Sequence, residues 1–296
     1  MSQDSLIGRT VAGYRLLQHV GEGGTATVYK AEHADRAPVA VKVLRSRLAQ
    51  DPVAIKRFLR EAEFGTRVNH PNIVRTYDYG QVDDLYYLAM EWVDGEALEK
   101  FAIRSGPLAP ALVATIIEQV GAALAATHAE NIIHRDLKPA NVMYNPATQR
   151  AVLLDFGIAR DVDLKPEERL TRTGFFVGTL QYVAPEALSG ELVNEQADVY
   201  SLATIAYYLL TGALPYNGRS PRELFQQLLT QAPIRLNQAV KGLRFPDAVE
   251  EAVMAGLERD LTRRTRTMGE FTAQLCAALR AGAGERKSFL KSLFGK

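Results

Sequence analysis

An acid, a base and an amide lie within a few residues of one another in the segment His134-Arg135-Asp136-Leu137-Lys138-Pro139-Ala140-Asn141. These residue types at this spacing, on a loop that contains proline, have no common structural purpose. A second charged motif, Asp155-Phe156-Gly157, begins nineteen residues after Asp136 and follows an apolar run. An isolated motif of the second kind is more often a turn than a metal site, but its place after the first favours a shared charged site.

Two segments nearer the N-terminus could bind an anion. Gly21-Glu22-Gly23-Gly24 separates two expected strands, where the glycines would let the backbone close over phosphate oxygens. A turn without a ligand is the alternative, and the following strand disfavours a dinucleotide-binding fingerprint, which needs a helix there. Lys42 ends an apolar strand, where its burial is costly unless an anion receives its charge, whereas an exposed edge lysine would need no partner.

A helix after Lys42 carries the expected partner of that lysine. Glu61 has Phe58 and Phe64 at helical spacing, so it is predicted to leave the inward side of the helix and to bind Lys42. Glu63 has Arg60 and Arg67 at helical spacing instead, and is expected to be a solvated ion-pair residue.

The elements that must position these residues fall into two groups. Short β-rich runs are expected at 14–20, 26–32, 38–44, 73–79 and 85–91, with one helix that begins near Asp51-Pro52. After Gly95 the spacing of apolar residues turns helical, with helices around 112–124, 202–210, 224–229, 249–257 and 271–279. The sequence therefore predicts an α+β protein with a small β-rich lobe and a larger helical lobe.

Composition limits the other classes. The 296 residues are 47% hydrophobic and carry 35 Lys and Arg against 34 Asp and Glu, so no overall field favours nucleic acid or a membrane as the main partner. Cys276 is the single cysteine and is interpreted as a packing residue in a reducing compartment. The N-terminus lacks a secretory pattern, and the uncharged run 199–216 is better explained as a buried helix, so a cytoplasmic location is expected.

Taken in order, these motifs resemble those of the protein-kinase family over residues 14 to about 280. The resemblance divides the chain into an extension 1–13, a kinase domain 14–280 with an N-lobe at about 14–91, a hinge at 91–95 and a C-lobe at 96–280, and a basic amphipathic tail 281–296. It implies a serine/threonine protein kinase that uses ATP with Mg²⁺, or with Mn²⁺ as the alternative. Protein substrates are the expected partners, nucleic acid is not, and homodimers occur among related bacterial kinases.

The resemblance also implies roles for individual residues. Asp136 would accept or orient the substrate hydroxyl proton, and Asn141 and Asp155 would hold the metal. Lys42 would contact the phosphates, with Glu61 holding its amine in place. Lys138 and Thr179 are typical of the serine/threonine branch. For ATP binding it implies the glycine turn, the hinge and the residues around adenine: Val20, Gly21, Glu22, Gly23, Gly24, Val28, Ala40, Lys42, Met90, Glu91, Val93 and Met143. Ordinary core roles are the alternative for Val28, Ala40 and Met143. The implied structural anchors are His134, Arg135, Phe156, Glu186, Asp198 and Arg264.

Thr171 and Thr173 lie in a segment that resembles an activation loop. Exposed threonines in such a loop can simply be solvated, but Arg135 is the residue that receives a loop phosphate in the family. We therefore expect autophosphorylation at both threonines. This pattern, with the Gly-Gly pair in the nucleotide loop, looks most like the bacterial branch of the family.

Two further expectations concern the conformation of Glu61 and the surface contacts of the C-terminal segment. Gly65 and Thr76 stand where larger apolar residues usually stack, so Glu61 is expected to swing away from Lys42 in the free, unphosphorylated protein. The segment 285–296 alternates basic residues with Phe and Leu, which suits weak contact with a membrane surface or a partner groove, against a frayed or docked terminus as the alternative.

Two other functions compete with an active protein kinase. A pseudokinase would keep the fold without transfer, but Lys42, Asp136, Asn141 and Asp155 are all present. A small-molecule phosphotransferase is the second rival, and Ala184-Pro185-Glu186 together with Gly178-Thr179 favours a protein substrate instead.

Overall fold

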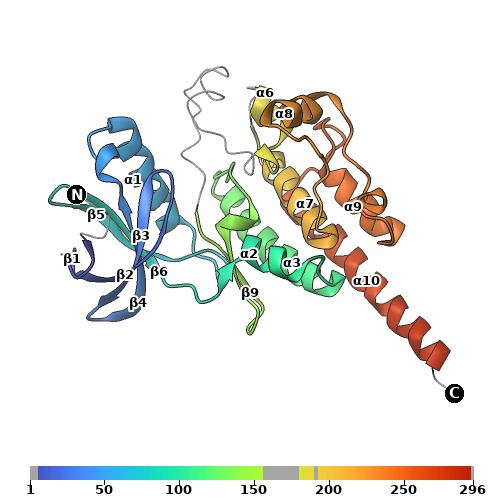
Figure 1. The fold of residues 1–296 in the computed structure, drawn as a ribbon, viewed down its shortest axis with the longest axis horizontal. Helices are drawn as coiled ribbons and strands as arrows, with labels where there is room; N and C mark the ends of the chain where they lie inside the picture. The colour runs from blue at the N-terminus through green and yellow to red at the C-terminus, as the bar shows by residue number, and fades with distance from the viewer. Residues whose placement is uncertain (1–5, 156–179, 190–192, 295–296) are drawn as a thin grey trace.

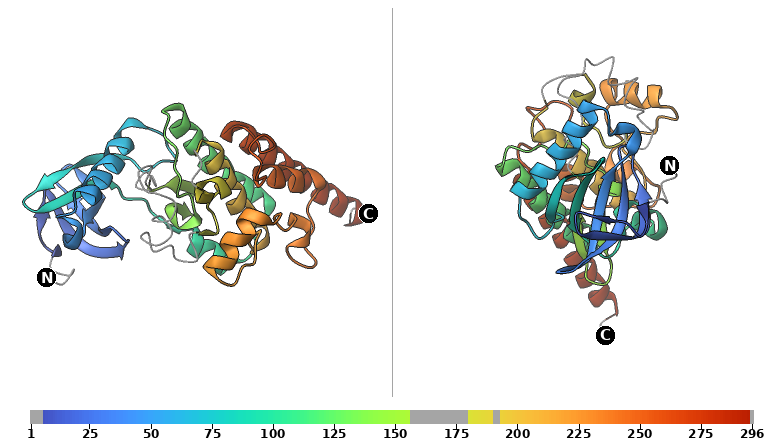
Figure 2. Two further views of the ribbon diagram at one scale, coloured as in Figure 1. Left: turned by 90° about the horizontal axis from the view of Figure 1, so that it is seen from above. Right: turned by 90° about the vertical axis from the view of Figure 1, so that its left-hand side faces the viewer.

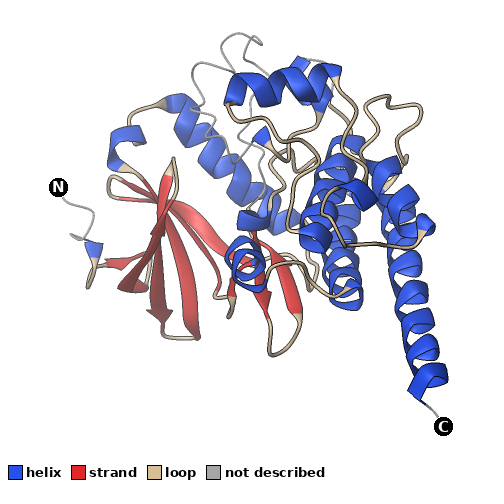
Figure 3. Ribbon diagram, turned by 45° about the vertical axis from the view of Figure 1, so that its right-hand side comes forward, coloured by secondary structure: helices blue, strands red, loops and turns tan. Residues whose placement is uncertain are grey.

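The computed structural model describes residues 6–155, 180–189 and 193–294, with the side chains of Ala37 and of residues 283–294 outside this description. A strand-rich lobe contains the N-terminal part of the chain and a helical lobe the C-terminal part (Figure 1; Figure 3). This arrangement confirms the predicted α+β fold with two lobes.

The first lobe is an antiparallel sheet with the strand order β1-β2-β3-β4-β6-β5. Its first strand forms within the segment 1–13, since Thr10 and Val11 pair with Arg15 and Tyr14. One apolar cluster includes Tyr29 and Val43, and another joins Ala40 and Met90 to the helix α1. The strands are β1 Thr10–Val11, β2 Tyr14–Glu22, β3 Ala26–His33, β4 Arg36–Leu44, β5 Thr76–Val82 and β6 Leu85–Glu91.

Helix α1, Pro52–Arg67, begins where the sequence predicted. The Asp51 side chain accepts hydrogen bonds from the backbone nitrogens of Val53 at 2.9 Å and Ala54 at 3.4 Å, and proline occupies the first helical position. A side-chain acceptor at this point satisfies amide groups that have no partner inside the helix. The cap therefore fixes the start of the helix that carries Glu61.

Strand β5 starts three residues later than predicted. Ile73 forms a parallel bridge with Leu153 of the second lobe, and the backbone nitrogen of Val74 donates to the Leu153 carbonyl at 2.9 Å. The segment is apolar, as the pattern indicated, but its residues pair with the second lobe and do not form the start of β5. The prediction of a strand over 73–79 was wrong at its first three residues for this reason.

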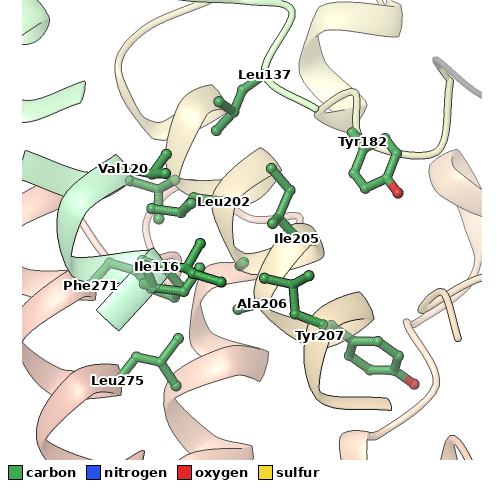
Figure 4. Close-up of a cluster of buried hydrophobic side chains, with 14 of the residues drawn as sticks. Ile116, Val120, Leu137, Tyr182, Leu202, Ile205, Ala206, Tyr207, Phe271 and Leu275 are labelled. Atoms are coloured by element: carbon green, nitrogen blue, oxygen red, sulfur yellow. The ribbon is translucent and has the colours of Figure 1, made fainter. Parts of the chain in front are cut away.

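The second lobe is mainly helical and also contains a three-stranded sheet of order β7-β8-β9. Figure 4 shows Ile116 and Val120 of α3, Leu202 and Ile205 of α7, and Phe271 and Leu275 of α10 in one apolar cluster. The elements are β7 Glu96–Ala97, α2 Leu98–Ser105, α3 Pro110–Ala129, β8 Val142–Asn145, β9 Arg150–Leu153, α6 Pro185–Ser189, α7 Gln196–Thr211, α8 Pro221–Thr230, α9 Asp247–Gly256 and α10 Met268–Phe294.

The long apolar helices lie in the interior of this lobe. Nearly every residue of α7 is buried, as expected for the uncharged run after Asp198. Among the described residues, α3 alone is long and apolar enough to cross a membrane by composition, but half of that window is buried against its neighbours. Cys276 is buried and donates to the Ala114 carbonyl, and burial raises the pKa of its thiol to about 11, which confirms a packing residue.

Helix α10 continues to Phe294 and extends away from the rest of the lobe at its C-terminal end (Figure 2). The backbone of the tail 285–294 is thus helical, as an amphipathic segment requires. Its proposed contact with a membrane or a partner stays a prediction.

Candidate active site

The segment between α3 and β8 is held by a buried carboxylate. Asp198 is fully buried at the start of α7, and its two oxygens accept hydrogen bonds from the backbone nitrogens of His134 at 2.8 Å and Arg135 at 3.0 Å. Arg135 has a φ of 64°, an unusual conformation for a residue with a side chain. Asp198 therefore fixes a strained backbone immediately before Asp136, as the family resemblance implied.

Three polar side chains converge after this anchor. Lys138 Nζ lies 3.2 Å from Asp136 Oδ2, and Asn141 Nδ2 donates to the Asp136 carbonyl at 2.9 Å and to its Oδ2 at 3.4 Å. Asp136 keeps a partly exposed carboxylate, with 19% of the side chain accessible. The loop thus presents an acid, a cation and an amide oxygen within one small region.

Lys42 meets carboxylates from both lobes. Its Nζ lies 2.7 Å from Glu61 Oε1 on α1 and 3.2 Å from Asp155 Oδ1, which follows β9. The lysine and the glutamate are 10% and 12% exposed, whereas Asp155 is 41% exposed. One buried cation therefore lies between two acids, of which Asp155 is the more accessible.

The charges of this cluster depend on one another. Burial alone would lower the pKa of Lys42, but Asp155 and Glu61 outweigh burial and raise it. Burial raises the pKa of Asp155, yet the adjacent Lys42 reverses this and holds that carboxyl ionised. Burial raises the pKa of Glu61 to about 7, and Lys42 opposes that rise. A single cation cannot fully compensate two adjacent acids, so the less exposed acid, Glu61, is the one that binds a proton more readily.

The expectation that Glu61 leaves Lys42 in the free protein was wrong, because the ion pair is formed. Its stated basis was a thin stack at Gly65 and Thr76. A Cβ atom at Gly65 would lie 2.3 Å from Thr76 Oγ1, so the absent side chain lets α1 and β5 approach closely. Small residues here mean tight packing, which holds the helix in place.

The substitution Gly65→Ala is expected to lower the free energy of unfolding by about 1–3 kcal/mol, since the added methyl group overpacks this contact. Alanine gains helix propensity, which offsets about 1 kcal/mol at most. Chemical denaturation of Gly65→Ala and of Gly65→Ala/Thr76→Ala measures the effect. The double variant should recover stability, whereas a Gly65→Ala protein as stable as the wild type would contradict the close packing.

The glycine turn has room above it. A Cβ atom at Gly21 or Gly24 would have no other heavy atom of the described chain within 4 Å, and at Gly23 it would meet the Ala26 carbonyl at 3.6 Å, an ordinary contact. These three glycines also have φ values outside the left-handed region. Packing and backbone conformation therefore do not require glycine at these positions, and the open space beside them leaves the backbone accessible to a ligand.

The residues expected around adenine come from both lobes. Val28, Ala40, Met90 and Val93 belong to one apolar cluster that also contains Leu154. Met143 is partly exposed on β8, opposite Val152 of the same cluster.

Two of the expected ATP-binding residues, Val20 and Glu91, are not part of this apolar cluster. Val20 is 48% exposed near the end of β2, and Glu91 ends β6 with its side chain bound to Arg150 at 2.8 Å. Most of the apolar residues of this set thus belong to one cluster next to the hinge backbone, whereas Val20 and Glu91 lie outside it.

A buried ion pair joins the remaining anchors. Arg264 Nη1 and Nη2 contact Glu186 Oε1 and Oε2 at 2.6 and 3.0 Å, and Arg264 also donates to the carbonyls of Glu258 and Gln196. The arginine side chain is fully buried and the glutamate is 4% exposed. The predicted pairing is therefore a bidentate contact with further hydrogen bonds.

Asp155 and Asn141 fit a magnesium ion that also binds phosphate. The Leu154 nitrogen donates to the Asn141 carbonyl at 2.9 Å, which brings the two candidate ligands together. Asn141 uses its amide nitrogen on Asp136, so its side-chain oxygen is the donor left for a cation. Magnesium commonly takes one or two protein oxygens and completes its shell with water and phosphate. Among the described residues, no group of three or more His, Cys, Asp or Glu side chains could hold a metal alone.

Sequence reasoning missed one residue of the anchor. His128 Nε2 lies 2.8 Å from Asp198 Oδ2 at the end of α3. The sequence contained a signal for this residue, because His128 follows Leu124 by four residues and so continues the inward apolar stripe of that helix.

Several predicted residues lie outside the described part of the chain: Phe156, Thr171, Thr173, Gly178 and Thr179.

A β-rich lobe with a buried Lys-Glu pair, facing a helical lobe with an anchored Asp-Lys-Asn loop, defines a two-lobed phosphoryl-transfer fold. The chain belongs to the protein kinase family, since residues 14–280 match its protein kinase domain.

Individual relatives agree with this assignment. Serine/threonine-protein kinase PrkC of Bacillus subtilis is 36% identical over 290 residues, which cover 96% of this chain and 43% of PrkC. The crystal structure of the Mycobacterium tuberculosis PknI kinase domain matches with a TM-score of 0.69 and 30% identity over 92% of this chain and 98% of that domain. The crystal structure of Rad53 1-466 in complex with AMP-PNP matches with a TM-score of 0.70 and 26% identity, over 89% of this chain and 65% of that chain. The chain spans less than half the length of PrkC.

The titration of Glu61 gives a prediction for activity. As the pH falls from about 8 to about 6, Glu61 takes up a proton because its pKa is raised to about 7, and Lys42 loses a charged partner. We expect kcat/KM for ATP, measured with excess Mg²⁺, to fall on this acid side, since that ratio reports the titration of the free enzyme.

The variant Glu61→Gln supplies the control. Its kcat/KM should be low and should lack this acid limb, because residue 61 no longer titrates. An unchanged acid limb in Glu61→Gln would assign the titration to another group.

The same titration affects the free energy of unfolding in the opposite direction. Between about pH 4.5 and 7 the folded protein binds the Glu61 proton more tightly than the unfolded chain does. The free energy of unfolding therefore falls as the pH rises through this range.

Proposed function

We propose that this chain is a serine/threonine protein kinase that transfers the γ-phosphate of ATP to protein hydroxyl groups, with Mg²⁺ or Mn²⁺ as the metal. The observation that carries this proposal is the opposition of two clusters: Lys42 with Glu61 and Asp155, and Asp136 with Lys138 and Asn141. The names of the relatives support the serine/threonine assignment, and the AMP-PNP complex of Rad53 supports an adenine nucleotide as the ligand.

Each residue has a role that its geometry supports. Lys42, kept charged by two acids, would bind phosphate oxygens, while Glu61 keeps its amine in place. Asp136 would accept the proton of the attacking hydroxyl, and Lys138 beside it would offset negative charge on the transferred group. A metal held by Asn141 and Asp155 would neutralise phosphate charge. The protein thus contributes mainly position and electrostatics.

The test is transfer of labelled γ-phosphate with Mg²⁺, to the protein itself and to a generic basic protein, followed by mapping of the phosphorylated residues. We expect transfer to both, with self-phosphorylation at Thr171 and Thr173. Nucleotide binding without any transfer would indicate a pseudokinase, and transfer to small molecules alone would indicate a small-molecule phosphotransferase. Loop phosphate on a Thr171→Ala/Thr173→Ala variant, seen by intact mass, would contradict the choice of these two threonines.

A further inference from the structure

The glycine turn carries a carboxylate, Glu22, in the segment that would cover the phosphates. Cross-strand partners share a face of a sheet. Glu22 pairs with Thr27, whereas Lys42 pairs with Val28, the next residue along β3. Successive residues of a strand point to opposite faces, so Glu22 lies on the face away from Lys42.

Arginines from the connection after β4 hold this turn. Arg45 Nη2 lies 2.7 Å from Glu22 Oε2, and the Arg45 backbone nitrogen donates to the Thr25 carbonyl at 2.9 Å. Arg47 Nη2 donates to the Gly24 carbonyl at 3.1 Å. Three contacts from one short connection therefore reach the turn, at Glu22, Gly24 and Thr25.

The Arg45–Glu22 pair differs from an ordinary surface pair. The Arg45 side chain is only 19% exposed and Glu22 is 36% exposed, whereas Arg15 and Glu32, which pair across β2 and β3, are 62% and 48% exposed. A less solvated pair is less screened by water and salt. Arg45 is thus placed to influence both the direction and the charge of Glu22, whose other oxygen, Oε1, lies 3.7 Å from His19 Nε2.

We propose that Arg45 is a positioning residue for the nucleotide: it holds the Glu22 carboxylate on the outer face of the sheet and cancels its charge, so that the turn can close over phosphates. Without the Arg45 countercharge, the Glu22 carboxylate would add negative charge near a polyphosphate bound under the turn, which disfavours its binding. Arg47 fixes the tip of the turn to the same connection. The inference rests on the proposed use of ATP.

The test is steady-state kinetics with Mg·ATP for Arg45→Ala, Arg45→Lys, Glu22→Gln/Arg45→Ala and the matched control Arg15→Ala. We expect Arg45→Ala to raise KM for ATP by roughly 5- to 10-fold with kcat changed less than about twofold, since the turn contributes similarly to the ground state and the transition state. Arg45→Lys should stay within about twofold of the wild type, and so should the double variant, because removing the carboxylate charge removes the repulsion. Arg15→Ala should leave KM unchanged.

Each outcome decides the inference. A double variant as impaired as Arg45→Ala, or more so, would show a merely structural role and overturn the charge argument. An unchanged KM in Arg45→Ala would overturn it as well, while leaving the proposed function intact. Failure of the wild-type protein to bind Mg·ATP would overturn both. Thermal unfolding without nucleotide checks folding, and if Arg45→Ala does not fold, Arg45→Gln with and without Glu22→Gln replaces it in the same comparison.

Discussion

Replacing Asp136 with asparagine is expected to lower kcat for phosphate transfer by about 10²- to 10⁴-fold, the usual loss when a positioned general base is removed. The amide cannot accept the hydroxyl proton, but its oxygen can still receive the hydrogen bond from Asn141. The loop geometry should therefore persist. The KM for ATP should change little, because Lys42 contacts Glu61 and Asp155 and, among the described residues, makes no hydrogen bond with Asp136.

The measurement is labelled phosphate transfer to a generic basic protein, with ATP affinity and thermal unfolding determined on the same samples. Asp35→Asn is a suitable control, because it makes the same chemical change in the exposed turn between β3 and β4. Transfer undiminished in Asp136→Asn would refute the assigned mechanism. A parallel loss of ATP binding or of folding would assign Asp136 a structural role instead.

The second large effect is on stability. Glu186→Gln is expected to lower the free energy of unfolding by about 3–5 kcal/mol, since it leaves the buried Arg264 guanidinium without its countercharge. The loss comes mostly from an uncompensated buried charge. Chemical denaturation measures it, provided that a single cooperative transition is observed.

The chain supplies a matched control next to this pair. Arg263 contacts Glu258 at 3.1 Å, but its side chain is 69% exposed, so Arg263→Ala should change the stability by less than about 1 kcal/mol. Equal effects of Glu186→Gln and Arg263→Ala would contradict the distinction between the buried and the exposed pair.

Much of the fold and of the site could be predicted because local patterns specify them. The N-cap at Asp51, the apolar stripe of α3 and the polar spacing from Asp136 to Asn141 are all short-range features, and each has the expected place. The Lys42–Glu61 contact followed from helical spacing. These inferences needed no knowledge of how distant segments pack.

The failures concern contacts between distant segments. Spacing could not reveal that Gly65 and Thr76 fit closely, so the absence of large side chains was interpreted as weakness. The same limit applies to Ile73, whose partner Leu153 lies far along the chain, and to the pairing of Arg45 with Glu22, which depends on strand register. Such features are set by tertiary packing, which a pattern in one segment does not encode.

The bridge between Ile73 and Leu153 has a mechanical consequence. The lobes are joined at the hinge after β6 and again at this bridge, where Leu153 also donates from its nitrogen to the Asn72 carbonyl at 2.8 Å. A second backbone attachment beside the hinge resists twisting of the lobes more than the hinge alone would. Twisting of one lobe over the other would have to break the backbone hydrogen bonds at Leu153, along with side-chain contacts between the lobes such as Lys42–Asp155 and Arg150–Glu91.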